Sequence, residues 1–386
     1  MPYHVPAKFK QVESGQGALS KAASNIAKAI AIMMMLMHHL FSTRSRIAAN
    51  GHGQDVSFYP FDAGQVLVFS QCLKACVAVF VFITAYGIYK SITAKHDPAE
   101  GDAGFAGVAM RYSCGHVVKL LINFWAVYIP FALLGFAVSD HTVLTVYGGE
   151  GVFNGFLYFL IDVLGLADMF GTPTLNDTWW YMSLAILLIF LLPACTLLAR
   201  KVGGVVLFGI VLILPPLAGF DTISSVWTYL PTAACGMAFA QYDLFSKLDF
   251  GAKKPWHYAL LFVACAVLML AVIRARRIDE LVFALNVVGA CLVCQMARIL
   301  EKVPGLTVAL QFVGRHSMNI FLLHTFIYSY YFGQFIYSFG HFLLIFAVLL
   351  AVSLLCSIVL EQLKRLTGYN RLRDRAVASV EQAIRG

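Results

Sequence analysis

Residues 28–39 read KAIAIMMMLMHH, an apolar run with a lysine at its first position and histidines at its last two. A run of this kind is typical of a helix that crosses a membrane. Ionisable side chains are rare inside such helices, and where they occur they often mark functional positions. The stretch therefore raises two questions: whether the chain is a membrane protein, and what Lys28 and His39 do in it.

The overall composition answers the first question. Of the 386 residues, 60% are hydrophobic and only 12% are charged, whereas about a quarter of the residues of an average soluble domain are charged. A soluble protein of this size would need more charges to cover its surface. The sequence therefore predicts a multi-pass protein of the cell membrane, with the lipid bilayer as its surroundings.

The net charge and the cysteines argue against other classes of function. A net charge of +8 indicates cytoplasmic loops beside anionic lipid rather than a nucleic-acid partner. Most of the nine cysteines lie in apolar runs, which favours small packing residues over a disulfide framework. Cys291 and Cys294 form a CxxC with no His or Asp ligand beside it, so we expect no metal site.

The apolar runs predict the fold class. A helix needs about 20 apolar residues to cross the hydrocarbon core of a bilayer. Ten such runs occur, at residues 26–42, 66–89, 117–138, 179–198, 203–219, 226–241, 257–273, 281–299, 317–337 and 341–360. A weaker eleventh run at 152–166 predicts a re-entrant or interfacial segment. The expected fold is an all-α polytopic membrane protein of about ten transmembrane helices, divided into a polar leader at 1–24, a ten-helix domain at 25–360 and a basic tail at 361–386.

The distribution of basic residues predicts the orientation in the membrane. Cytoplasmic loops carry an excess of Lys and Arg. With ten spans and a cytoplasmic N-terminus, most of the 28 lysines and arginines fall on the inner side, so both ends of the chain are expected to be cytoplasmic. The exception is RARRIDE at 274–280. It reads as a self-paired anchor at the outer interface, with a contact for an anionic substrate as the second interpretation. Lys74 lies within the second span.

Lys28 and His39 are eleven positions apart, and at about 100° per residue they share one face of a helix. The helix rises about 16 Å between them, half of a core about 30 Å thick. With Lys28 near the inner boundary, His39 is expected near the midplane, where a histidine can stay neutral by taking a hydrogen bond from a neighbouring helix. Four interpretations remain open: a satisfied interior histidine, a proton relay, a haem ligand and a general base. The one other deep histidine, His324, is too little to favour haem.

Further motifs follow the Lys28–His39 spacing in a fixed order. They are VFVFITAYGIY at 79–89, RYSCGHVVKLLINFWAVYI at 111–129, NDTWWYMSLAIL at 176–187 and GRHSMNIFLLHTFI at 314–327. Together they resemble the acyltransferase-3 family of integral-membrane O-acyltransferases, over about residues 22–360. The chain departs from the family pattern at Thr84 and Ala85, where Ser and Gly are usual, and lacks a denser arginine cluster around Arg111 and Lys119.

The resemblance implies an activity for the 25–360 domain. Members of the family move an acyl group, usually acetyl, from cytoplasmic acyl-CoA to a hydroxyl of a glycan or other acceptor at the outer face. Acetyl-CoA would then be the co-substrate, with its phosphates held by Lys28, Arg111 and Lys119. His39 would act as the general base on the acceptor hydroxyl, with an acyl-histidine as the alternative.

An acyl transfer also needs hydrogen-bond donors for the oxyanion and contacts for the substrate. The candidates are Trp179 and Asn319 and, as our choice for substrate contact, Trp180, Tyr181, Ser317 and His324. Trp and Tyr at the end of a span are also ordinary members of the aromatic belt of a membrane protein, so their interpretation as site residues depends on the resemblance.

A transporter or flippase is the alternative function. His39 and His324 would then relay protons for a small or lipid-linked substrate. Transporters often carry Gly- or Pro-interrupted helices at matched positions in their two halves. Pro215 and Pro216 have no counterpart in the second half, so we prefer the acyltransferase.

Overall fold

The computed structural model describes residues 18–384 except 52–54, 98, 100, 221–225, 250–253 and 276–281. In that part of the chain the regular structure is helical, apart from an isolated bridge between Ser57 and His341. Among the described residues, seven helical segments are long and apolar enough to cross a membrane. They are α1 (Lys21–Phe41), the run of α3 (Ala63–Cys72), η1 (Leu73–Ala75) and α4 (Cys76–Lys95), α5 (Gly101–Val138), η4 (Asp177–Trp179) with α9 (Trp180–Val202), α13 (Pro255–Ala275), α14 (Val282–Leu300) and α18 (Phe342–Leu366). An all-helical polytopic membrane protein is confirmed.

The other three predicted spans are short or interrupted. Residues 203–219 form α10 (Gly204–Leu217), and residues 226–241 form η5 (Val226–Thr228) and α11 (Leu230–Tyr242). The 14 residues of α10 rise about 21 Å, less than a bilayer core of about 30 Å. The predicted span 317–337 is divided into α16 (Ser317–Thr325), the π-helical η7 (Phe326–Tyr331) and α17 (Gly333–Tyr337). The count of ten helices and the cytoplasmic placement of both ends stay predictions.

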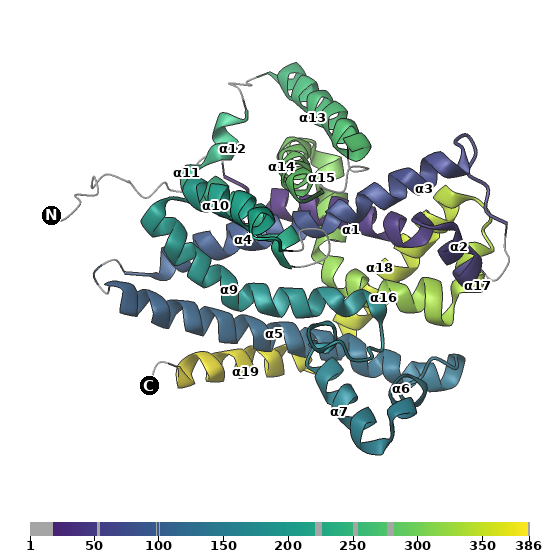
Figure 1. The fold of residues 1–386 in the computed structure, drawn as a ribbon. Helices are drawn as coiled ribbons and strands as arrows, with labels where there is room; N and C mark the ends of the chain where they lie inside the picture. The colour runs from purple at the N-terminus through teal and green to yellow at the C-terminus, as the bar shows by residue number, and fades with distance from the viewer. Residues whose placement is uncertain are drawn as a thin grey trace.

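Several short elements complete the described chain. The weak run at 152–166 forms α7 (Val152–Val163), which is too short to cross a bilayer. With α6 (Val143–Tyr147) and α8 (Ala167–Phe170) it projects from one side of the bundle (Figure 1). The remaining helices are α2 (Arg44–Gly51), the 3₁₀ turn η3 (Gly148–Glu150), α12 (Leu244–Lys247) and α15 (Pro304–Arg315). Most of the predicted leader, and Arg276 and Arg277 of the outer arginine cluster, lie outside the described residues.

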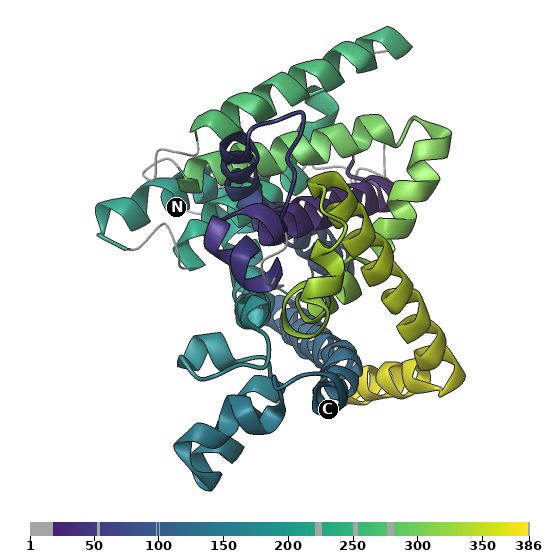
Figure 2. The same ribbon diagram turned by 90° about the vertical axis from the view of Figure 1, so that its right-hand side faces the viewer.

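Helix α1 lies in the middle of the bundle (Figure 2). It packs against α3, α4, α14, α15, α16 and α18, so its long apolar run is buried between neighbours rather than facing lipid. The helix begins where the Ser20 side chain accepts a hydrogen bond of 2.9 Å from the Ala23 N–H, a typical N-cap. Because α1 is surrounded by other helices, its side chains contact several of them.

Helices α4 and α11 come into close contact at a glycine. A Cβ atom on Gly236 of α11 would lie 2.6 Å from the backbone oxygen of Phe82 on α4. Since side chains do not pack at that distance, this crossing requires a residue without a Cβ. The crossing fixes α4 against α11, and α4 is one wall of the cavity described below.

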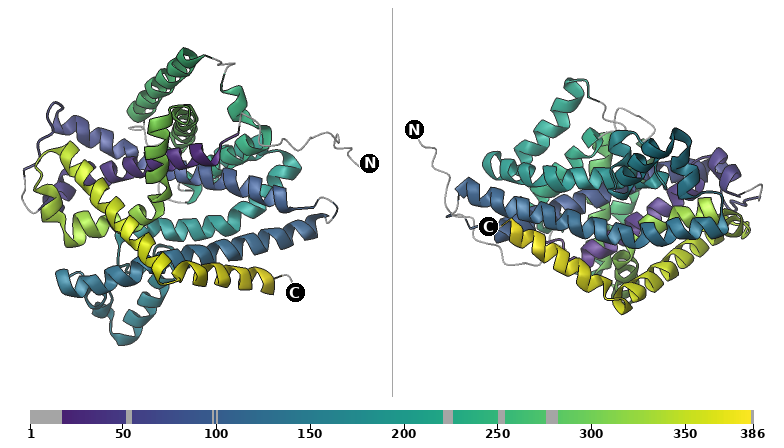
Figure 3. Two further views of the ribbon diagram at one scale, coloured as in Figure 1. Left: turned by 180° about the vertical axis from the view of Figure 1, so that it is seen from behind. Right: turned by 90° about the horizontal axis from the view of Figure 1, so that it is seen from below.

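Helix α5 begins sixteen residues before the predicted span 117–138, and its first half packs along the C-terminal helix α19 (Tyr369–Ala383) (Figure 3). The Tyr369 hydroxyl donates a 2.7 Å hydrogen bond to the Ile122 carbonyl. Helix α18 also runs past the predicted boundary at 360, to Leu366. Much of the predicted basic tail is therefore a helix docked on the membrane domain.

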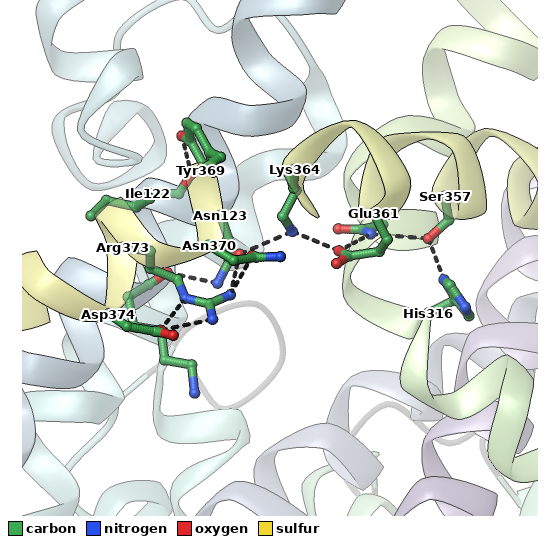
Figure 4. A network of polar contacts seen from close by, with 12 residues as sticks. Ile122, Asn123, His316, Ser357, Glu361, Lys364, Tyr369, Asn370, Arg373 and Asp374 are labelled. Carbon is green, nitrogen blue, oxygen red and sulfur yellow. Dashed lines mark hydrogen bonds and ion pairs between the residues drawn. The ribbon is translucent and has the colours of Figure 1, made fainter. Parts of the chain in front are cut away.

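A polar network joins α5, α16, α18 and α19 (Figure 4). The ammonium of Lys364, which is almost fully buried, donates to Glu361 at 2.6 Å and to Asn123 at 3.1 Å. Asn319 donates to the same Glu361 oxygen at 2.9 Å and to Ser357 at 3.0 Å. A buried ammonium is stable in a membrane protein only when it is paired in this way. The network holds the start of α16 in place.

Candidate active site

A cavity of about 300 Å³ lies against the central helix and is lined by residues of α1, α4, α9 and α16. Most of its wall is apolar. Its polar and aromatic lining consists of Lys28, His38, His39, Lys74, Thr84, Thr178, Trp180, Tyr181 and Ser317. None of the residues that line it is acidic. A narrow apolar cavity with lysines and no carboxylate suits an anionic or thioester ligand better than a cation.

Lys28 and His39 both line this cavity, so the prediction that they share one face of the helix is confirmed. The helix rise between them is about 16 Å. The cavity therefore extends along three turns of α1, with Lys28 at one end and His39 at the other. One ligand of that length would touch both residues.

The His39 ring lies among other rings at its end of the cavity. Its centroid is 5.1 Å from that of His324, 5.2 Å from that of His38 and 6.4 Å from that of Tyr328. His38 donates from Nδ1 to the Ser70 carbonyl at 2.8 Å, because a carbonyl oxygen only accepts. His39 is partly exposed and lines the cavity.

His324 is fully buried. Its Nδ1 lies 2.8 Å from the Phe321 carbonyl and 3.2 Å from the Ile320 carbonyl. Since carbonyls only accept, Nδ1 carries a proton and donates to them. The Thr325 hydroxyl lies 3.3 Å from Nε2. His324 is therefore packed against His39 and held by its own helix, without lining the cavity itself.

A chain of hydroxyls connects His324 to the loop that precedes α9. The Thr325 hydroxyl lies 3.0 Å from that of Thr178, which donates to the Asn176 side-chain oxygen at 2.7 Å. Immediately after Thr325 the backbone widens into the π-helical turn η7, a rare conformation that is common at functional sites. His324, and His39 beside it, thus lie next to the point where α16 ends and the π-helical turn begins.

The two tryptophans at the start of α9 have different surroundings. Trp179 is buried and donates its indole N–H to the Leu322 carbonyl at 3.0 Å, so it joins α9 to α16 and has no donor left for an oxyanion. Trp180 lines the main cavity and also two smaller cavities of about 140 and 240 Å³. The larger of these is also lined by Asp168 and Asp177. Trp180 therefore stands between the main cavity and this second, more polar space.

The remaining predicted site residues divide into two groups. Tyr181 and Ser317 line the main cavity with Trp180. Asn319 is bonded to Ser357 and Glu361 instead. Arg111 and Lys119 lie on α5 and do not line the cavity, and Lys119 is exposed. Their assignment as contacts of the donor stays a prediction from the resemblance.

Lys74 is the cavity residue that the sequence reasoning missed. It lies in η1, a single 3₁₀ turn that interrupts the long helix between α3 and α4, and it lines the cavity with Lys28 and His39. The signal was present, because a lysine within an apolar span marks a functional position by default. The sequence analysis noted only that Lys74 lies within the second span, on neither side of the membrane.

A buried carboxylate supports the loop that leads into α9. Asp162 of α7 accepts hydrogen bonds from the Tyr147 hydroxyl at 2.5 Å, the Thr174 hydroxyl at 2.8 Å and the Leu175 N–H at 2.9 Å. Burial raises the pKa of Asp162, and these hydrogen bonds partly oppose the rise. Through Thr174 and Leu175 the carboxylate fixes the segment that places Thr178 and Trp180 at the cavity.

Comparison with known proteins adds one match. A family model described as an acyltransferase domain of the acyltransferase-3 type matches residues 21–362. No curated protein and no solved structure matches the chain. Among the described residues, no group of three or more His, Cys, Asp or Glu side chains is arranged to hold a metal ion.

Proposed function

Because the chain belongs to the acyltransferase-3 family and is a membrane acyltransferase, we propose that it transfers an acetyl group from cytoplasmic acetyl-CoA to a hydroxyl of a cell-surface glycan or a similar acceptor. The observation that carries the proposal is the cavity that joins Lys28 to His39. It gives an acyl-CoA one binding path that starts at a cation and ends at a histidine.

The donor enters from the end of the cavity at Lys28. The ammonium of Lys28 binds a phosphate of CoA as a point charge. The slim pantetheine arm then lies along the apolar wall formed by Val77, Phe80 and Leu188. Its thioester arrives at the end where the ring of His39 faces the cavity.

The chemistry at His39 is a direct acyl transfer. The neutral imidazole takes the proton of the acceptor hydroxyl while its oxygen attacks the thioester carbonyl carbon. The carbonyl oxygen becomes an oxyanion in the tetrahedral intermediate. The intermediate collapses, the carbon–sulfur bond breaks, and the CoA thiolate takes the proton back from the imidazolium. Products are the ester and CoA, and His39 returns to its neutral form.

The acceptor approaches beside Trp180, Tyr181 and Ser317. Trp180 offers an aromatic face to a sugar ring or similar body, and the hydroxyls of Tyr181 and Ser317 offer hydrogen bonds. His324 holds the ring of His39 from the side away from the cavity. The transporter alternative accounts for the histidines but leaves the pairing of Lys28 with His39 along one cavity without a purpose.

The test of this function is thioester turnover by the purified protein in detergent. Wild type is given acetyl-CoA and a mixed glycan extract, and free CoA is measured. We expect turnover in wild type, and loss of about 10²–10⁴-fold in His39→Ala. His257→Ala, on the peripheral helix α13, is the matched control and should keep full activity. Wild type that neither releases CoA nor gains melting temperature from acetyl-CoA would refute the donor.

A further inference from the structure

Lys74 lies in the cavity between the two ends of the proposed donor path. The carbonyl of Ser70, one helical turn before it, accepts the hydrogen bond from His38. Farther along, the Tyr86 hydroxyl accepts from the Leu19 N–H at 3.1 Å. Helix α4 therefore runs antiparallel to α1, and Lys74 falls between the level of Lys28 and the level of the histidines.

The direction of the side chain places the charge of Lys74 at the histidine end. Side chains lean toward the N-terminus of their own helix, which here is the direction of Ser70 and His38. Lys74 and His39 line the same cavity. Arg46, by contrast, donates to the Ser42 hydroxyl at 3.0 Å and does not line the cavity.

In the described part of the chain, the ammonium of Lys74 has no acidic partner, and no carboxylate lines the cavity. An unpaired lysine within an apolar span is costly, and such residues mark functional positions. The 3₁₀ turn η1, Leu73–Ala75, interrupts the α3–α4 run with Lys74 at its centre, which is the kind of local irregularity found at functional hinges and sites.

We propose that Lys74 is a catalytic residue that stabilises the negative charge of the acyl transfer. This proposal rests on the proposed function. The charge develops on the thioester carbonyl oxygen as the acceptor attacks, and it moves to the sulfur as the carbon–sulfur bond breaks. Lys74 keeps its proton throughout, while His39 takes the hydroxyl proton and returns it to the thiolate. Lys74 is an exposed residue at the wall of the cavity, and a cation there stabilises both charges more than it stabilises the neutral thioester.

The first test is the kinetics of Lys74→Met, which keeps most of the unbranched side chain and removes its charge. We expect kcat to fall about 10²–10³-fold, as when one oxyanion-stabilising group is lost, with the KM for acetyl-CoA changed by less than about threefold. Lys74→Arg should recover part of kcat. Lys95→Met, at the exposed end of the same helix, is the matched control and should behave as wild type. A variant that raises only KM, or changes nothing, would overturn the proposal.

The second test measures binding and requires no turnover. A cation at the sulfur favours the CoA thiolate over the thiol, so the affinity of wild type for CoA should rise between about pH 7 and pH 9, toward the thiol's own pKa. Desulfo-CoA, which lacks the sulfur, should show no such rise. Lys74→Met should lose the rise while keeping its affinity for desulfo-CoA. An equal pH dependence in both proteins would overturn the role of Lys74, whereas absence of CoA binding to wild type would refute the proposed donor instead.

Discussion

The rings of His39 and His324 lie 5.1 Å apart, centroid to centroid, although they come from the first and the last thirds of the chain. His39 faces the cavity, and His324 is sealed behind it with both ring nitrogens in contact with hydrogen-bonding partners. His39 is thus open to a ligand in the cavity, and we propose that His324 holds its ring in place. The predictions below follow from this division and from the packing around it.

Replacing His324 by alanine should lower kcat by about 10-fold to 10²-fold, because His39 loses the ring that fixes its orientation and small displacements of a reacting group are costly. The KM for acetyl-CoA should change little, since His324 does not line the cavity. Steady-state kinetics in detergent measure both. Thr325→Val, which removes only the hydroxyl beside Nε2, should have a smaller effect. An unchanged kcat in His324→Ala would contradict the positioning role.

Lys28→Ala should raise the KM for acetyl-CoA about 10-fold, a loss of about 1.4 kcal/mol, with kcat largely kept, because Lys28 lies at the far end of the cavity from His39. Lys28→Arg should stay close to wild type. The matched control is Lys21→Ala, at the exposed start of the same helix. A fall in kcat with an unchanged KM would place Lys28 in the chemistry instead.

The same measurement on Lys119→Ala decides the assignment taken from the resemblance. Lys119 is exposed on α5 and does not line the cavity, so we expect its KM for acetyl-CoA to shift less than that of Lys28→Ala. An equal or larger shift would mean that the phosphates of CoA extend out of the cavity and along α5.

Asp162→Ala should destabilise the fold by about 3 kcal/mol, because the Tyr147 and Thr174 hydroxyls and the Leu175 N–H lose a buried acceptor. Thermal denaturation in detergent measures the change as a lower melting temperature. Asp168→Ala removes an exposed carboxylate nearby and should leave the melting temperature unchanged. Equal melting temperatures for the two variants would show that the Asp162 network does not stabilise the loop that precedes α9.

Gly236→Ala should destabilise the protein by about 1–3 kcal/mol, because the added Cβ would lie 2.6 Å from the Phe82 oxygen and the two helices must separate. Gly209 on α10 is the control, since a Cβ there meets nothing within 4 Å. Gly209→Ala should be neutral or slightly stabilising. The two melting curves, recorded side by side, test the crossing of α4 and α11 without reference to activity.

The central helix was predictable because its signals are local. The apolar run at 28–39 and the eleven-residue spacing are read from neighbouring positions, and both survive in the structure as a buried helix with Lys28 and His39 on one face. The same reasoning identified Trp180, Tyr181 and Ser317, which line the cavity. It also named His324 as the one other deep histidine, but it did not predict that the two rings lie side by side.

The interrupted span at 317–337 was not predictable, because its cause is tertiary. The π-helical turn η7 lies where Ser329 donates to the Asn50 side chain at 2.9 Å and where a Cβ on Gly333 would clash with the Asn50 backbone oxygen. Asn50 is remote in the sequence, so no pattern within 317–337 reveals it. For the same reason, apolar runs do not distinguish a full crossing from the shorter α10 and α11.

Lys74 shows a different kind of failure. Its position within an apolar span was visible, but the count of basic residues assigned it to neither side of the membrane and drew nothing further from it. The role of Lys74 is inferred from the cavity, and the cavity forms only where α4 packs against α1 and α9. The opposite error is possible for Arg111 and Lys119. The family pattern assigned them to the site, but they do not line the cavity.

Because α1 packs against α14, α15 and α16, its contacts form late in biosynthesis. A ribosome adds roughly 5–20 residues per second, so His324 leaves it roughly 15–60 s after His39. During that interval α1 stands in the membrane with two histidines and a lysine that lack their final neighbours. The rings of His39 and His324 therefore meet only near the end of translation, and a chain released early has His39 without the ring that packs against it.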